Sequence, residues 1–74
     1  MTYKEKIIAT AYTGIMFVDG SHLGDVYAYE QEKLGHSIIN VMHADEEFCE
    51  KLRNAVHEDF LAMLQGKFET TNNN

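Results

Sequence analysis

The last third of the sequence carries the clearest periodic pattern. Large apolar residues recur there at steps of four and three: Phe48, Leu52, Val56, Phe60 and Met63. This spacing places them on one face of a helix. Asp45 is a suitable N-cap residue before the segment, and Gly66 follows its expected end near Gln65. The pattern predicts one long helix whose apolar face the rest of the chain must cover.

The beginning of the chain predicts another helix. Thr2 and Glu5 have the spacing of a capping box, in which side chain and backbone satisfy each other's hydrogen-bonding groups, so the helix begins at about Tyr3. Apolar residues then recur at helical spacing: Ile7, Ile8, Ala11, Tyr12, Ile15 and Met16. We therefore expect this helix to continue to Phe17 or Val18.

The stretch Ala11-Tyr12-Thr13-Gly14 is unusual inside such a helix. Thr13 has a stiff β-branched side chain, and Gly14 costs roughly 1 kcal/mol relative to alanine in a helix interior. A small residue lets another backbone or a ligand approach, and the hydroxyls of Tyr12 and Thr13 can hydrogen-bond to it. We interpret the stretch as a contact surface.

A middle helix is predicted from about Leu23 or Asp25 to Leu34. Gly35 follows it, where a left-handed C-terminal cap is expected. Before it, residues 19–21 have turn chemistry, and Ser21 or Asp25 is available as the N-cap. The following residues 36–43 are apolar and β-branched but have no partner strand, so we expect an extended connector lying between helices.

The expected fold is therefore all-α, a small three-helix domain with a short extended connector between its second and third helices. Residues 1–66 form this domain, and the polar residues 67–74 are expected to be disordered. A chain of 74 residues buries a thin core, so we expect homo-oligomerisation. No run reaches the ~20 apolar residues that a membrane span requires.

The charge of the chain limits its partners. Twelve acidic against six basic side chains give a formal charge of −6, which argues against direct binding of nucleic-acid phosphates. The same acidity could instead imitate nucleic acid toward a basic host protein. The single cysteine, Cys49, rules out an internal disulfide and suits a reducing compartment, so we expect a cytoplasmic protein.

No motif predicts catalysis, a metal or a cofactor. The four histidines lack HExxH spacing, no CxxC pair is present, and no glycine-rich phosphate loop occurs. Acidic neighbours of Cys49 disfavour its thiolate, which argues against a nucleophile. The alternative of a small metal-dependent or acid/base enzyme would use Asp19, Asp25, His43 and Asp45.

Several short motifs together resemble a known family. They are Ala11-Tyr12-Thr13-Gly14 followed by an acidic turn, Asp25-x-x-x-Tyr29, Leu34-Gly35, Ala44-Asp45 and Asp59-Phe60. Over about residues 4–64 the chain resembles a family of short phage and prophage proteins of Gram-positive bacteria, known as a domain of unknown function. Relatives carry Thr-His-Glu ahead of Ala-Asp, whereas this chain has residues 40–42 as Asn-Val-Met and His43 next to Ala44.

The resemblance implies a small phage accessory protein that counters host defence by binding a host protein or a small ligand, a nucleotide among the candidates. In this hypothesis the protein is not an enzyme and acts in the host cytoplasm. Tyr12, Thr13 and Gly14 would make close contacts, with Asp25 and Tyr29 facing them from the middle helix. Asp45 completes the set of predicted binding residues.

Overall fold

The structure is a computed structural model that describes residues 1–38 and 40–66. Its elements in chain order are α1 (Tyr3–Thr13), η1 (Gly20–His22), α2 (Leu23–Leu34), η2 (Asn40–Ala44) and α3 (Glu46–Leu64), where η denotes a 3₁₀ helix. The described residues contain no strand, so the predicted all-α fold with three main helices is confirmed. Residue 39 and the tail predicted over 67–74 lie outside the described residues.

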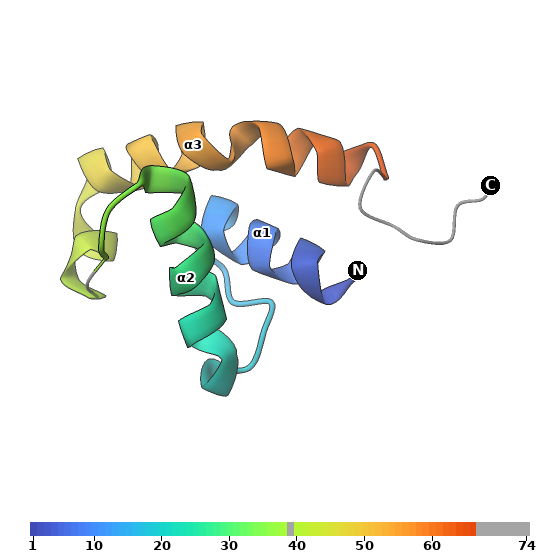
Figure 1. Ribbon diagram of the computed structural model, residues 1–74, viewed down its shortest axis with the longest axis horizontal. Coiled ribbons are helices and arrows are strands. Elements are labelled where there is room, and N and C mark those ends of the chain that lie inside the picture. Colours follow the sequence, from blue (N-terminus) through green and yellow to red (C-terminus); the bar gives the residue numbers. More distant parts are fainter. Residues whose placement is uncertain (39, 67–74) are drawn as a thin grey trace.

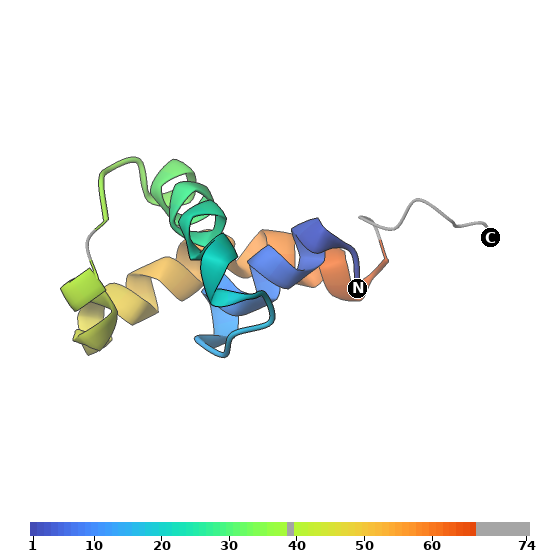
Figure 2. The same cartoon turned by 90° about the horizontal axis from the view of Figure 1, so that it is seen from below.

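The helices pack around one small core. α3 follows the long dimension of the molecule, α1 lies along it in the opposite direction, and α2 crosses both (Figures 1 and 2). The buried side chains come from all three helices: Ile7, Ile8, Ala11, Val26, Tyr29, Leu52 and Val56. The helical spacing read from the sequence therefore identifies the apolar faces that form the core.

The predicted capping box at the start of α1 is confirmed. The backbone N–H of Glu5 donates to Oγ1 of Thr2 at 3.1 Å, and the backbone N–H of Thr2 donates to Oε1 of Glu5 at 2.7 Å. Glu5 is buried although it is acidic. Its carboxylate satisfies the Thr2 N–H, one of the backbone donors that the start of a helix otherwise leaves free.

The predicted end of α1 at Phe17 or Val18 is wrong, because the helix ends at Thr13. Gly14 adopts the left-handed conformation with φ 79°, and its N–H donates to the Thr10 carbonyl at 2.9 Å. Ile15 continues the helical spacing in the sequence, but its side chain is 62% exposed. The glycine is therefore a helix terminator rather than an interruption within a helix.

The two threonines complete this termination. The Thr10 hydroxyl donates to the Lys6 carbonyl at 2.7 Å and accepts from the Phe17 N–H at 3.0 Å. The Thr13 hydroxyl donates to the Ala9 carbonyl at 2.7 Å and accepts from the Ile15 N–H at 3.1 Å. Each hydroxyl thus satisfies backbone groups on both sides of the helix end, a role for which threonine is suited.

This account predicts opposite effects for two glycine substitutions. Gly14→Ala should lower the free energy of unfolding by about 1 kcal/mol, because a left-handed backbone is unfavourable for alanine. Gly24→Ala should raise it by about 0.5 kcal/mol, because Gly24 lies within α2 and a Cβ there meets open space. Urea unfolding followed by circular dichroism measures both. A neutral or stabilising Gly14→Ala would contradict the assigned role.

The remaining helix ends agree with the sequence except at the start of α2. Gly35 is the left-handed cap of α2 with φ 79°, as predicted. The N-cap of α2 is His22 rather than Ser21 or Asp25, because η1 leads directly into the helix. At α3 the predicted Asp45 cap is confirmed, with its Oδ1 accepting from the Glu47 N–H at 3.1 Å.

The connector was predicted to be extended throughout, and this is wrong for its second half, where η2 forms. Ile38 is buried, and its N–H donates to the side-chain oxygen of Gln31 at 3.0 Å. η2 then places His43 against α2 and α3. Among the described helices, none combines the length and hydropathy needed to cross a membrane.

Candidate ligand-binding site

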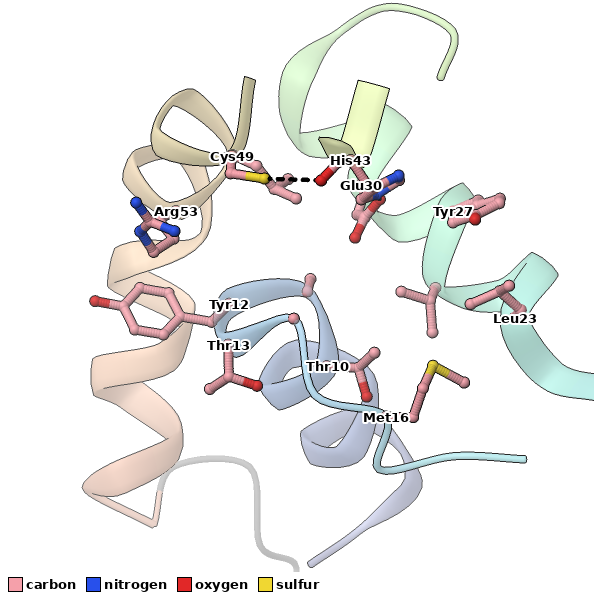
Figure 3. A pocket seen from close by; sticks show the side chains of 14 residues that line it. Thr10, Tyr12, Thr13, Met16, Leu23, Tyr27, Glu30, His43, Cys49 and Arg53 are labelled. Atoms are coloured by element: carbon pink, nitrogen blue, oxygen red, sulfur yellow. Dashed lines mark hydrogen bonds and ion pairs between the residues drawn. The ribbon is translucent and has the colours of Figure 1, made fainter. Parts of the chain in front are cut away.

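A cavity of about 300 Å³ lies beside the end of α1. Its walls come from α1, α2, η2 and the first half of α3 (Figure 3). The apolar part of its wall is formed by Ala11, Met16, Leu23, Val26 and Leu52. The polar and aromatic side chains that line it are Thr10, Tyr12, Thr13, Tyr27, Glu30, His43, Cys49 and Arg53. This volume lies at the lower end of the range for small-molecule pockets, roughly 300–1,000 Å³.

Glu30 is the buried charged group of this cavity. Its residue surface is only 2% exposed, and Nε2 of His43 lies 2.8 Å from its Oε1. Burial raises the pKa of the Glu30 carboxyl, and the hydrogen bond from His43 partly opposes this rise. A carboxylate is thus held in largely apolar surroundings with a single side-chain partner among the described residues.

His43 is fixed by aromatic contacts on both sides. The Tyr27 ring stacks on it with centroids 5.2 Å apart, and the Phe48 ring meets it edge-on at the same distance. Its Nδ1 is buried without a hydrogen-bond partner among the described residues. The Cys49 thiol donates to the His43 carbonyl at 3.4 Å (Figure 3). These contacts hold the imidazole where Nε2 meets Glu30.

The opposite side of the cavity is formed by Tyr12 and Arg53. The Tyr12 ring stacks on Phe60 of α3 with centroids 4.2 Å apart, and its hydroxyl lies 3.4 Å from Nδ1 of His57. Arg53 is exposed, and its guanidinium forms no hydrogen bond or ion pair within the described part of the chain. The cavity therefore has an anionic group inside it and a cationic group at its exposed edge.

The predicted binding residues fall into two groups. Tyr12, Thr13 and Gly14 line the cavity. Asp25, Tyr29 and Asp45 do not. The prediction that Asp25 and Tyr29 face Tyr12 is wrong, because their side chains hydrogen-bond to Tyr3 and Asp59 instead.

Each of those three residues has a different partner. Asp25 accepts a hydrogen bond from the Tyr3 hydroxyl, which raises the pKa of Tyr3. Tyr29 donates to Asp59 at 2.6 Å, and Asp45 caps α3. These contacts connect or terminate helices.

Three of the residues named for the enzyme alternative, Asp25, His43 and Asp45, bond to separate partners. Asp25 bonds to Tyr3, His43 to Glu30, and Asp45 to its own helix. Across residues 1–38 and 40–66, no three His, Cys, Asp or Glu side chains are grouped as metal ligands would be. The geometry supplies no acid/base or metal constellation from this set.

Glu30 and Arg53 line the cavity but were not predicted from the sequence as site residues. One signal for Glu30 was present, because it occupies the apolar stripe of α2 that also contains Val26. A carboxylate on a core-facing stripe requires a partner. Its partner His43 comes from a 3₁₀ helix that the sequence did not predict, so the pair was visible only in three dimensions.

A second polar cluster, away from the cavity, joins α2 to α3. The Tyr29 hydroxyl donates to Oδ2 of Asp59, and Nζ of Lys33 lies 3.0 Å from the same oxygen. Lys4 lies over the Tyr29 ring, 5.0 Å from its centroid. Burial and the hydrogen bond to Asp59 raise the pKa of Tyr29 far above its usual range. Burial alone would raise the pKa of Asp59, but Tyr29 and Lys33 outweigh it and lower that pKa.

Tyr29→Phe should lower the free energy of unfolding at pH 7 by about 1 kcal/mol through loss of this hydrogen bond. The folded-state pKa of Asp59 is depressed, so ionised Asp59 contributes to the free energy of unfolding above its unfolded-state pKa of about 3.9. This contribution is lost as the pH falls through the pKa of Asp59 in the folded state. The variant should therefore lose less stability than the wild type on acidification. Urea midpoints between pH 2 and pH 7 measure this, and parallel curves would contradict it.

Comparison of the chain with protein-family models, with curated proteins and with solved structures finds no match.

Proposed function

We propose that this protein is a non-enzymatic binding protein whose cavity beside Tyr12, Thr13 and Gly14 receives a small ligand. The supporting observation is the cavity itself, which combines apolar walls with a few polar groups at defined positions. This combination is typical of small-molecule sites, in which apolar area contributes affinity and polar groups fix orientation. A side chain of a host protein is the second kind of occupant that we consider.

We further propose that the protein is a phage-type accessory protein that counters host defence, with a nucleotide among its candidate ligands. This part rests on the resemblance of the Ala11-Tyr12-Thr13-Gly14 and Asp25-x-x-x-Tyr29 motifs to the phage family. The lone Cys49 suits a reducing compartment, so we place the protein in the cytoplasm of the host cell.

Homo-oligomerisation is also part of the proposal. Ile15, Met16 and Phe17 are exposed together in the segment after α1, and Leu61 and Leu64 are exposed near the end of α3. Patches of exposed apolar side chains are common at protein–protein interfaces. Sedimentation equilibrium distinguishes an oligomer from a monomer.

The thiol of Cys49 offers a direct assay for ligand binding, because it lines the cavity and is the only cysteine. The rate of its modification by iodoacetamide would be measured with each member of a library of small metabolites that includes nucleotides. A compound that occupies the cavity should slow the modification, since it covers the sulfur.

Two matched variants control this assay. Ala11→Leu fills part of the cavity and should abolish the protection, whereas Ala28→Leu on the exposed side of α2 should preserve it. Circular dichroism would be used to check that both variants fold. Equal protection of Cys49 in the Ala11→Leu variant would contradict the proposed function.

A further inference from the structure

The most informative group in the cavity is the Glu30 carboxylate. Glu30 is 2% exposed, lines the cavity, and is directed toward the space between the helices (Figure 3). A carboxylate has about four sites that accept hydrogen bonds. Within residues 1–38 and 40–66, only one donor reaches it, Nε2 of His43 at its Oε1. Its other oxygen therefore retains its capacity to accept.

Within the described residues, the rest of the cavity wall donates no second hydrogen bond to Glu30. The hydroxyls of Thr10 and Thr13 donate to backbone carbonyls within α1. The Cys49 thiol donates to the His43 carbonyl. The other lining side chains are apolar, such as Ala11 and Leu52, apart from Tyr12, whose hydroxyl lies by His57, Tyr27, which stacks on His43, and the exposed Arg53. A buried carboxylate in such surroundings costs free energy that a further donor would offset.

We propose that the ligand of this cavity is a small organic cation, an amine or amidine carried on an apolar body, whose N–H groups donate to Glu30. This inference rests on the proposed function, since it names the chemical class of the ligand for the same cavity, and it sets aside the nucleotide candidate, whose phosphate Glu30 would repel. The apolar walls receive the body of the ligand, and the carboxylate receives its charged end. A cation adds a charge–charge attraction to its hydrogen bond with the buried carboxylate, which favours it over a neutral donor.

Arg53 is the one cationic side chain of this wall. It is exposed, so water and salt screen its repulsion of a cation at the buried Glu30. An anionic ligand would reverse the arrangement, because its charge would pair with Arg53 and be repelled by Glu30. A preference for cationic ligands would therefore indicate selection by Glu30, and a preference for anionic ligands would indicate selection by Arg53.

The test uses three probes of similar size: benzylamine, benzyl alcohol and phenylacetate. Each is titrated into the ¹⁵N-labelled full chain at pH 7, and dissociation constants come from amide chemical shifts of the residues that line the cavity. Benzylamine should bind at least tenfold more tightly than benzyl alcohol, and phenylacetate should bind most weakly. Glu30→Gln keeps an oxygen for His43 but removes the charge, so it should abolish the preference for benzylamine.

Glu32→Gln is the matched control, because Glu32 is exposed on the same helix and lies outside the cavity wall. It should leave the preference for benzylamine unchanged. Equal binding of all three probes in the cavity would overturn this inference while leaving the proposed function intact. Tighter binding of phenylacetate, or a preference for benzylamine that survives Glu30→Gln, would also overturn it. If none of the probes binds, the inference fails, and the Cys49 protection assay still decides the proposed function separately.

Discussion

Replacement of Ile8 by alanine is expected to lower the free energy of unfolding by about 3 kcal/mol. Ile8 is completely buried at the centre of the core, where α1 meets α2 and α3. The substitution removes buried apolar surface and leaves a cavity that the surrounding helices fill only partly. A domain of this size is stabilised by roughly 4–11 kcal/mol in total, so the loss is a large fraction of its stability.

Ile15→Ala provides the matched control for this prediction. Ile15 is 62% exposed in the segment after α1, so at protein concentrations at which the chain is monomeric the same substitution should change stability by less than about 0.5 kcal/mol. Urea unfolding followed by circular dichroism at 222 nm compares the two variants. Similar losses for both would mean that Ile8 is not at the centre of the core, which would contradict the helix packing described above.

Replacement of His43 by alanine is expected to lower the free energy of unfolding at pH 7 by about 2–3 kcal/mol. The variant loses a ring packed between Tyr27 and Phe48, and it removes the only described hydrogen-bond donor to the buried Glu30. Because His43 is partly exposed, we expect less than the full cost of breaking a completely buried pair.

The loss in His43→Ala should depend on pH in a defined direction. Burial raises the folded-state pKa of Glu30. The contribution of protonated Glu30 to the free energy of unfolding is therefore fully present below its unfolded-state pKa of about 4.3. This contribution is lost as the pH rises through the pKa of Glu30 in the folded state. Without His43 this pKa rises further, so the difference from the wild type should be smaller at acidic pH and larger at neutral pH.

A double-mutant cycle separates the Glu30 contact from the packing of the ring. The Glu30→Gln/His43→Ala variant should be more stable than the sum of the single effects implies, because a neutral amide needs a partner less than a carboxylate does. His36→Ala is the control, since His36 is exposed and, among the described residues, hydrogen-bonds only to the adjacent Ser37 carbonyl. Additive effects in the cycle, or equal losses for His43→Ala and His36→Ala, would contradict a coupled pair.

Most of the fold could be predicted from local signals. The Thr2–Glu5 capping box, the Asp45 cap and the glycine after α2 each act within a few residues of their position in the chain. The apolar spacing of α3 likewise reports which face is buried, with Leu52 and Val56 in the core. These features can be predicted from the sequence because the capping residue and the helix end that it stabilises are only a few residues apart.

The predictions were wrong where two local signals in the sequence favoured different structures, or where the contact partner of a residue lies far away in the sequence. The apolar spacing continued past Gly14, yet the glycine and the threonine hydroxyls end α1 at Thr13. The connector contained β-branched residues, yet its second half forms η2. Apolar periodicity alone does not distinguish an apolar residue that packs in the core from one that lies exposed after a helix end, as Ile15 does.

The candidate site was predictable only in part, for the same reason. Tyr12, Thr13 and Gly14 were recognised because their composition is unusual within a helical pattern. The binding hypothesis suggested by the family resemblance has Asp25 and Tyr29 facing them, whereas the partners of these residues are Tyr3 and Asp59. Which face of α2 meets which neighbour depends on how the helices cross, and that information is not local to α2.

Mapping a bound compound by NMR is the sharpest test of whether the cavity at the end of α1 is a binding site. Amide chemical shifts of the ¹⁵N-labelled chain would be followed during titration with a compound that protects Cys49. We expect the largest changes in residues 10–14 and 49–53, with little change around the Tyr29–Asp59 contact. Changes centred on that contact, or spread evenly over all three helices, would contradict this expectation.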